Sequence, residues 1–89
     1  MKLDSNELAC LMIEVARANF GAEPFGRRKL MKLTEDKVRK KGLWELEDDN
    51  LSGSSDPKSI GLANIDYRFS DIAHTKLIQV RRGIWRLKS

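Results

Sequence analysis

The stretch that decides the fold is Leu77-Ile-Gln-Val-Arg-Arg-Gly-Ile-Trp-Arg-Leu87, near the end of the chain. Its β-branched and aromatic residues lie on both sides of Arg81-Arg82-Gly83, a pattern typical of two short strands joined by a tight turn. Glycine supplies the positive φ that such a turn needs. The sequence therefore predicts a β-hairpin over residues 77–87 with arginines at its tip.

An amphipathic helix is expected at the start of the chain, over about residues 5–20. Asp4 and Glu7 form a capping-box pattern, and apolar residues then recur at helical spacing until Gly21. Cys10 falls within this segment, and because an unpaired cysteine usually behaves as a small hydrophobic residue, we expect it in the core.

Two more helices are expected before the hairpin. Gly26 is an acceptable N-cap for a second helix over residues 27–41, and Thr34 leaves open a break into two shorter helices. The third helix, about 58–74, follows Asp56-Pro57, in which a capping residue precedes a proline that suits the first helical position.

The segment between the second and third helices is less regular. Residues 43–46, Leu-Trp-Glu-Leu, alternate in character and predict a short strand, after which residues 47–57 are typical of a loop. An 89-residue chain has room for one small domain, residues 1–89. The expected fold class is α+β, mainly α, with three helices and a C-terminal hairpin: a winged helix-turn-helix with the hairpin as the wing.

Residues 62–88, which include the hairpin, also carry a resemblance to a known family. This stretch resembles the end of the N-terminal winged-helix domain of Mrr-type restriction endonucleases and the related HARE-type winged helices, in which a helix runs into a similar hairpin. The matching residues are Leu77, Ile78, Arg82, Gly83, Ile84, Trp85, Arg86 and Leu87. The resemblance implies recognition of DNA near the wing; because we expect no nuclease domain within these 89 residues, cleavage is not implied.

Charge is distributed unevenly along the chain, whose net charge is +4. Residues 25–42 carry eight basic and two acidic side chains, residues 43–57 carry five acids and no base, and residues 75–89 carry five bases and no acid. Two basic segments suggest a polyanionic partner if folding brings them onto one face. A solubilising surface is the alternative.

The expected partner is double-stranded DNA. The third helix would enter the major groove, the hairpin would contact backbone or minor groove, and the first turn of the second helix would bind phosphate, since cations there oppose the helix dipole until an anion arrives. An ordinary solvated face, with Arg68 paired to Asp71 or Asn64, is the competing interpretation of the third helix. The candidate DNA-binding residues are Arg27, Arg28, Lys29, Lys58, Asn64, Tyr67, Arg68, Lys76, Arg81, Arg82 and Arg86.

Other functions have weaker support in the sequence. An enzyme, a metal site and a cofactor are not expected: Glu35-Asp-Lys37 lacks a further acid on a neighbouring strand, His74 has no partner, and a calcium-like pattern over residues 48–59 ends in Ser59 instead of a carboxylate. A protein partner could dock on the acidic 45–56 loop. Without a long apolar run or a second cysteine, we expect a cytoplasmic protein, and a homodimer stays open.

Overall fold

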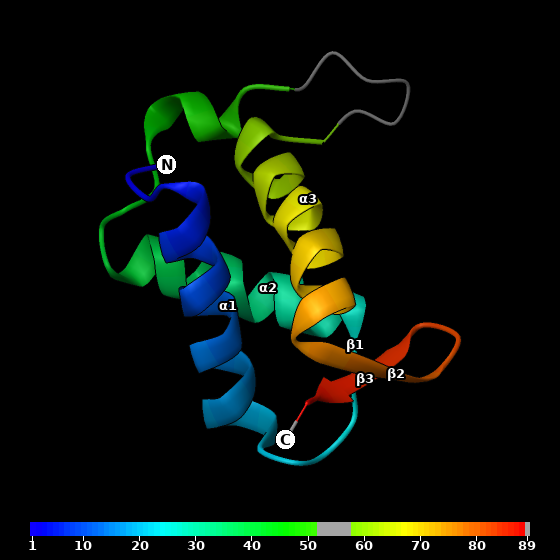
Figure 1. Ribbon diagram of the computed structural model, residues 1–89. Helices are drawn as coiled ribbons and strands as arrows, with labels where there is room; N and C mark the ends of the chain where they lie inside the picture. Colours follow the sequence, from blue (N-terminus) through cyan, green and yellow to red (C-terminus); the bar gives the residue numbers. More distant parts are fainter. Residues whose placement is uncertain (52–57, 89) are drawn as a thin grey trace.

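The computed structural model describes residues 1–51 and 58–88. Three helices pack on one another, and a small three-stranded antiparallel sheet lies at one end of them (Figure 1). The order along the chain is α1 (Ser5–Phe20), β1 (Phe25–Gly26), α2 (Arg27–Lys40), the 3₁₀ turn η1 (Leu46–Asp49), α3 (Ile60–Thr75), β2 (Leu77–Arg81) and β3 (Ile84–Leu87). The α+β class, the three helices and the hairpin are confirmed.

Local capping explains where the helices begin. The carboxylate of Asp4 accepts from the backbone N–H of Glu7 at 2.8 Å, and the Glu7 carboxylate accepts from the N–H of Asp4 at 3.1 Å, so the predicted capping box of α1 is confirmed. Helix α3 begins at Ile60, where the Ser59 hydroxyl accepts from the N–H of Leu62. Asp56 and Pro57, the predicted start, lie outside the described residues, but Lys58 and Ser59 are not helical, so the helix begins later than predicted.

Helix α2 is continuous, and the alternative of a break at Thr34 is wrong. The Thr34 side chain is fully buried, and its hydroxyl donates to the carbonyl oxygen of Leu30 at 2.8 Å. This bond satisfies the hydroxyl inside the helix, so Thr34 does not need to act as a cap.

Two other expectations are wrong. Cys10 is exposed, because the apolar face of α1 follows its neighbours Leu8, Leu11 and Met12, and position 10 points away from that face. Residues 43–46 form no strand: after Gly42 the chain runs irregularly to η1, since Trp44 packs against Gly61 of α3 instead of entering the sheet.

The core lies where the three helices meet. Its fully buried side chains come from all three, so each helix contributes an apolar face to one cluster. The largest of them are Phe69, Met12, Leu30, Ile65 and Val38.

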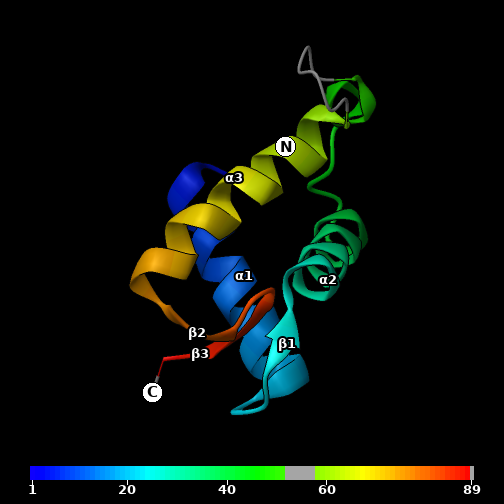
Figure 2. The same ribbon diagram turned by 90° about the vertical axis from the view of Figure 1, so that its right-hand side faces the viewer.

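The sheet has the order β1-β3-β2, so β3 is its central strand. β2 and β3 form the predicted hairpin, with Gly83 at φ +78° in its turn and a register shift between Gln79 and Arg81. The two-residue strand β1 was not predicted; it pairs Phe25 with Trp85 and Gly26 with Ile84. Figure 2 shows the result: the hairpin lies beside β1 and the start of α2.

Among residues 1–51 and 58–88, no helix is both long enough and apolar enough to span a membrane.

Candidate nucleic-acid interface

The first turn of α2 is unusually cationic. It contains Arg27, Arg28 and Lys29 and no acidic residue, and its N-cap, Gly26, has no side chain to accept from the free backbone N–H groups. Because the N-terminus of a helix is the positive end of its dipole, three cations there repel one another and the helix. An anion bound beside Arg28 and Lys29 would reduce that repulsion.

Arg27 is used within the fold. Its guanidinium bonds the carboxylate of Asp66, donates to the Asp66 carbonyl oxygen at 3.2 Å and to Ser70 Oγ at 3.2 Å, and lies 4.6 Å from the centre of the Phe69 ring. Arg27 therefore fastens the start of α2 to the middle of α3. Arg28 and Lys29 are exposed, and neither forms an ion pair with residues 1–51 or 58–88.

Asp66 binds two basic side chains at the start of α2 and before α3, and the sequence did not predict this role. Besides Arg27, it accepts from Lys58 Nζ at 2.7 Å, so a second predicted DNA contact is paired within the fold. Burial alone would raise the pKa of Asp66, but the hydrogen bonds from Lys58 and Arg27 outweigh it and hold the pKa below its ordinary value. Its partner Arg27 is 39 residues away, so no local pattern could reveal the pair.

The hairpin turn brings a second pair of cations to the same place. Arg81 and Arg82 are exposed beside Gly83, and neither pairs with an acid in the described part of the chain. Through the β1–β3 pairing, Gly26 lies so close to the turn that a methyl group on it would be 3.9 Å from the Gly83 carbonyl oxygen.

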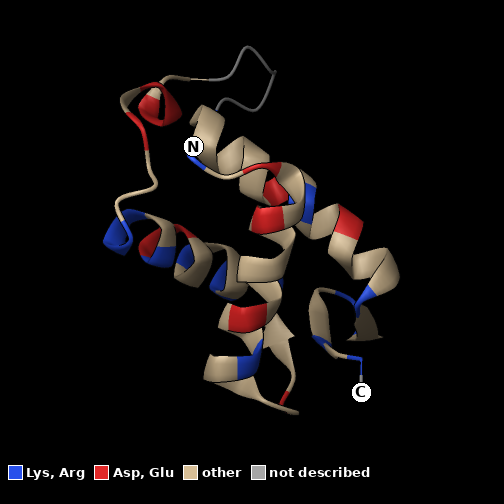
Figure 3. Ribbon diagram, turned by 60° about the vertical axis from the view of Figure 1, so that its left-hand side comes forward, with Lys and Arg blue, Asp and Glu red and all other residues tan. Residues whose placement is uncertain are grey.

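Folding therefore joins the two basic segments that the sequence predicted. The backbone of Gly26, which precedes the cations of α2, lies beside that of Gly83, which follows the cations of the hairpin. We call these four residues the cationic cluster: Arg28, Lys29, Arg81 and Arg82. Figure 3 shows basic residues along α2 and around the hairpin, with the acidic residues of η1 at the opposite end of the molecule.

Two predicted contacts on the hairpin lie away from its tip. Arg86 is half-buried in β3, opposite Ile78. Lys76 is the C-cap of α3, at the base of the hairpin, where its carbonyl oxygen accepts from the N–H of Lys88 at 2.9 Å. Neither extends the cationic cluster at the turn.

The predicted reading face of α3 meets the start of α1. Asn64, Tyr67 and Arg68 line a small cleft of about 100 Å³ with the first residues of the chain. The Arg68 guanidinium pairs with Asp71 and donates to Ser5 Oγ at 3.0 Å, while its buried Nε has no partner among the described residues. The Arg68–Asp71 pair that the competing interpretation predicted is present, whereas Tyr67 is 69% exposed.

Two acids of the segment 43–57, Glu45 and Asp48, form ion pairs within the fold. Asp48 is 1% exposed and binds the terminal ammonium of Met1 at 2.8 Å, and Glu45 binds the same group at 2.9 Å. Burial would lower the pKa of this amine, but its hydrogen bonds to Asp48 and Glu45 outweigh burial and raise the pKa above its ordinary value. Residues 52–57 of the predicted calcium-like pattern lie outside the described residues.

Two residues of the enzyme-like fragments lie on α2 and α3. Glu35 binds Arg39 at 2.8 Å, and His74 is exposed in the last turn of α3. Within residues 1–51 and 58–88, no three His, Cys, Asp or Glu side chains are grouped so that they could hold a metal ion.

Comparison with known protein families, with curated proteins and with solved structures finds no match to this chain.

Proposed function

We propose that the chain is a small cytoplasmic DNA-binding protein built on a winged-helix plan, with the hairpin β2–β3 as the wing. The observation that carries this proposal is the β1–β3 pairing, which joins the first turn of α2 to the hairpin turn. Four exposed cations, the cationic cluster, then share one end of the molecule without an acidic partner in the described chain. Clustered cations that bind no acid are the electrostatic signature of a polyanion site.

The cluster suits the phosphate backbone of a duplex. Arg28 and Lys29 would each bind a phosphate near the free N–H groups of α2, and Arg81 and Arg82 would bind phosphates of the other strand or along the minor groove. Arg27 supports this arrangement by tying the start of α2 to Asp66 and Ser70 of α3. Helix α3 would then enter the major groove, and its exposed Tyr67 would be the first candidate for a base contact.

The test is fluorescence anisotropy of a labelled 20-base-pair duplex, titrated at several salt concentrations. If the four cations of the cluster each neutralise a phosphate, log K should fall against log salt with a slope of about −3.6. The double variant Arg81→Glu/Arg82→Glu should lose most binding.

The matched control is Lys40→Glu/Lys41→Glu, which changes the net charge equally but lies at the other end of α2, about 18 Å from Arg28 along the helix. Its affinity should change far less. Equal losses in both variants would mean that binding follows net charge alone, and the proposed interface would be rejected.

A second function, docking of a basic protein partner at the acidic segment, is favoured by one observation. Leu46 and Leu51 are 87% and 73% exposed beside Glu47, and large apolar side chains this open are typical of contact surfaces. Asp48 is unsuitable as a test site because it is buried in the fold. Leu46→Ser/Leu51→Ser should abolish capture of such a partner and leave DNA binding unchanged; capture of DNA and no protein would contradict this second function.

A further inference from the structure

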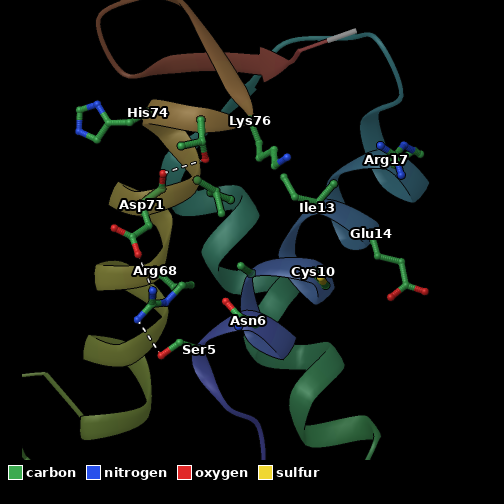
Figure 4. A pocket seen from close by; sticks show the side chains of 13 residues that line it. Ser5, Asn6, Cys10, Ile13, Glu14, Arg17, Arg68, Asp71, His74 and Lys76 are labelled. Carbon is green, nitrogen blue, oxygen red and sulfur yellow. Dashed lines mark hydrogen bonds and ion pairs between the residues drawn. The ribbon is translucent and has the colours of Figure 1, made fainter.

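A groove of about 740 Å³ runs between α1 and α3, away from the cationic cluster (Figure 4). Its apolar surface is formed by Ala9 and Ile13 of α1 and Ile72 of α3, and Cys10 lies at its edge. From Arg68 of α3 to its C-cap, Lys76, the groove extends over eight residue steps, or about 12 Å. A volume between about 300 and 1,000 Å³ with an apolar lining is typical of sites for small organic ligands.

The charged residues of the groove are arranged asymmetrically. Figure 4 shows the Lys76 side chain extending between the two helices toward Ile13, whereas the Glu14 carboxylate points away from the groove. Asp71 is held by Arg68. Neither Lys76 nor Arg17, at the same end of the groove, forms an ion pair within residues 1–51 and 58–88.

We propose that this groove binds an elongated apolar carboxylate, at a site that does not include the cationic cluster. The hydrocarbon body would cover Ala9, Ile13 and Ile72, and the carboxylate would pair with the ammonium of Lys76. The apolar surface disfavours a hydrated nucleic-acid backbone, and the exposed cation at one end, which forms no ion pair among the described residues, favours an anionic group there. One apolar body with one terminal charge matches both features.

Cys10 provides a direct measure of occupancy, because it is exposed at the groove and is the only cysteine of the chain. A ligand in the groove would cover the thiol and slow its alkylation by iodoacetamide. With decanoate as the probe, at about 1 mM, we expect the alkylation rate to fall at least about five-fold, as it would for a ligand that occupies most sites. 1-Decanol, which has the same chain and no carboxylate, should protect far less.

Two lysine variants locate the carboxylate. Lys76→Gln should remove most of the protection by decanoate, and Lys76→Arg should keep it. Lys29→Gln is the control, because it removes a cation of the cluster and not of the groove: it should weaken DNA binding and leave the protection unchanged. Since the two measurements are separate, failure of either proposal can be recognised without the other, and circular dichroism verifies that each variant is folded.

Three results would overturn the proposal. The first is that decanoate does not slow alkylation. The second is a result showing that the carboxylate does not pair with Lys76. Equal protection by decanol and decanoate, or protection of Lys76→Gln like that of the wild type, would show this. The third is that, without ligand, alkylation slows as the protein concentration rises while sedimentation shows a dimer, because a second copy would then occupy the groove.

Discussion

The two ends of α2 are both rich in cations, but the cations differ in whether an acidic side chain binds them. At the C-terminal end, Arg39 bonds Glu35 at 2.8 Å and Asp49 at 3.3 Å, and its guanidinium lies 4.2 Å from the centre of the Trp44 ring. Its hydrogen bond with Glu35 is the largest influence on its pKa, which is raised above the ordinary value. At the N-terminal end, Arg28 and Lys29 find no acid in the described chain.

The helix dipole also affects the cations at the two ends of α2 in opposite ways. Cations near a helix C-terminus are stabilised, whereas cations in the first turn are destabilised, each by about 0.3–1 kcal/mol. The C-terminal cations of α2 therefore contribute to folding, and Arg28 and Lys29 cost stability. A charge that weakens the fold and has no partner within it is a sign of binding elsewhere, as stability is often lost at functional sites.

The strongest prediction follows from this conflict. Arg28→Glu/Lys29→Glu should weaken binding to the 20-base-pair duplex by at least about 30-fold at low salt, because two phosphate contacts become repulsions. The same variant should unfold at a higher denaturant concentration, with a gain of about 0.5–1 kcal/mol, because acids suit the first turn of a helix. Anisotropy and urea titration measure the two effects. Loss of both binding and stability would mean that these residues support the fold.

At the other end of α2, packing matters more than charge. Gly61, in the first turn of α3, lies against the indole of Trp44, and a methyl group there would overlap the ring. Gly61→Ala should therefore cost about 1–2 kcal/mol of unfolding free energy, since the overlap exceeds the roughly 1 kcal/mol that alanine gains in a helix. The measurement is urea denaturation. The folded variant should bind DNA like the wild type; a variant as stable as the wild type would show that Trp44 is not held in place.

Asp66 connects the N-terminal end of α2 to α3, and its loss should have an intermediate effect. Asp66→Asn should lower the unfolding free energy by about 1 kcal/mol, because Arg27 and Lys58 lose a charged partner. The pKa of Asp66 is lowered by folding, so its stabilisation is present above the unfolded pKa, about 4, and is lost as the pH falls through the lower folded value.

The pH dependence of stability, compared between Asp66→Asn and the wild type, is the control for this prediction. Unfolding free energy measured between neutral and acid pH should fall less steeply below about pH 4 in Asp66→Asn than in the wild type. Parallel curves for the two proteins would contradict the assigned ion pairs.

The smallest effect is expected for Lys40→Glu/Lys41→Glu. Acids at the C-terminal end of α2 oppose the dipole, so this variant should lose about 0.5 kcal/mol or less of stability, measured by urea denaturation, and keep nearly all DNA binding. The signs are therefore opposite to those at Arg28 and Lys29. A stability gain at both ends would show that overall net charge, and not the helix dipole, decides the outcome.

The sequence predicted the elements that depend on neighbouring residues. Asp4 and Glu7 cap α1 three residues apart, and Gly83 sits in the turn between strands that adjoin it, so both patterns are visible locally. Even the pairing of Arg68 with Asp71 follows from their spacing, and it was one of the alternatives.

The sequence did not predict what depends on distant residues. Strand β1 is two residues long and exists because Phe25 pairs with Trp85, sixty residues further along the chain. The use of Arg27 within the fold has the same origin, because its partner Asp66 is remote. Cys10 is a different case. Its helix was predicted correctly, but Cys10 was assigned to the buried apolar face of that helix, from which it points away.

The two tryptophans give the molecule an optical reporter at each end. Trp85 lies on the central strand, paired with Phe25, and its ring meets Phe69 edge-on, with centroids 5.7 Å apart. Trp44 donates from Nε1 to Asp49 at 3.1 Å. The chain has no third tryptophan. In Trp44→Phe, tryptophan fluorescence therefore comes only from Trp85 in β3, next to the hairpin turn. In Trp85→Phe, it comes only from Trp44 at the opposite end.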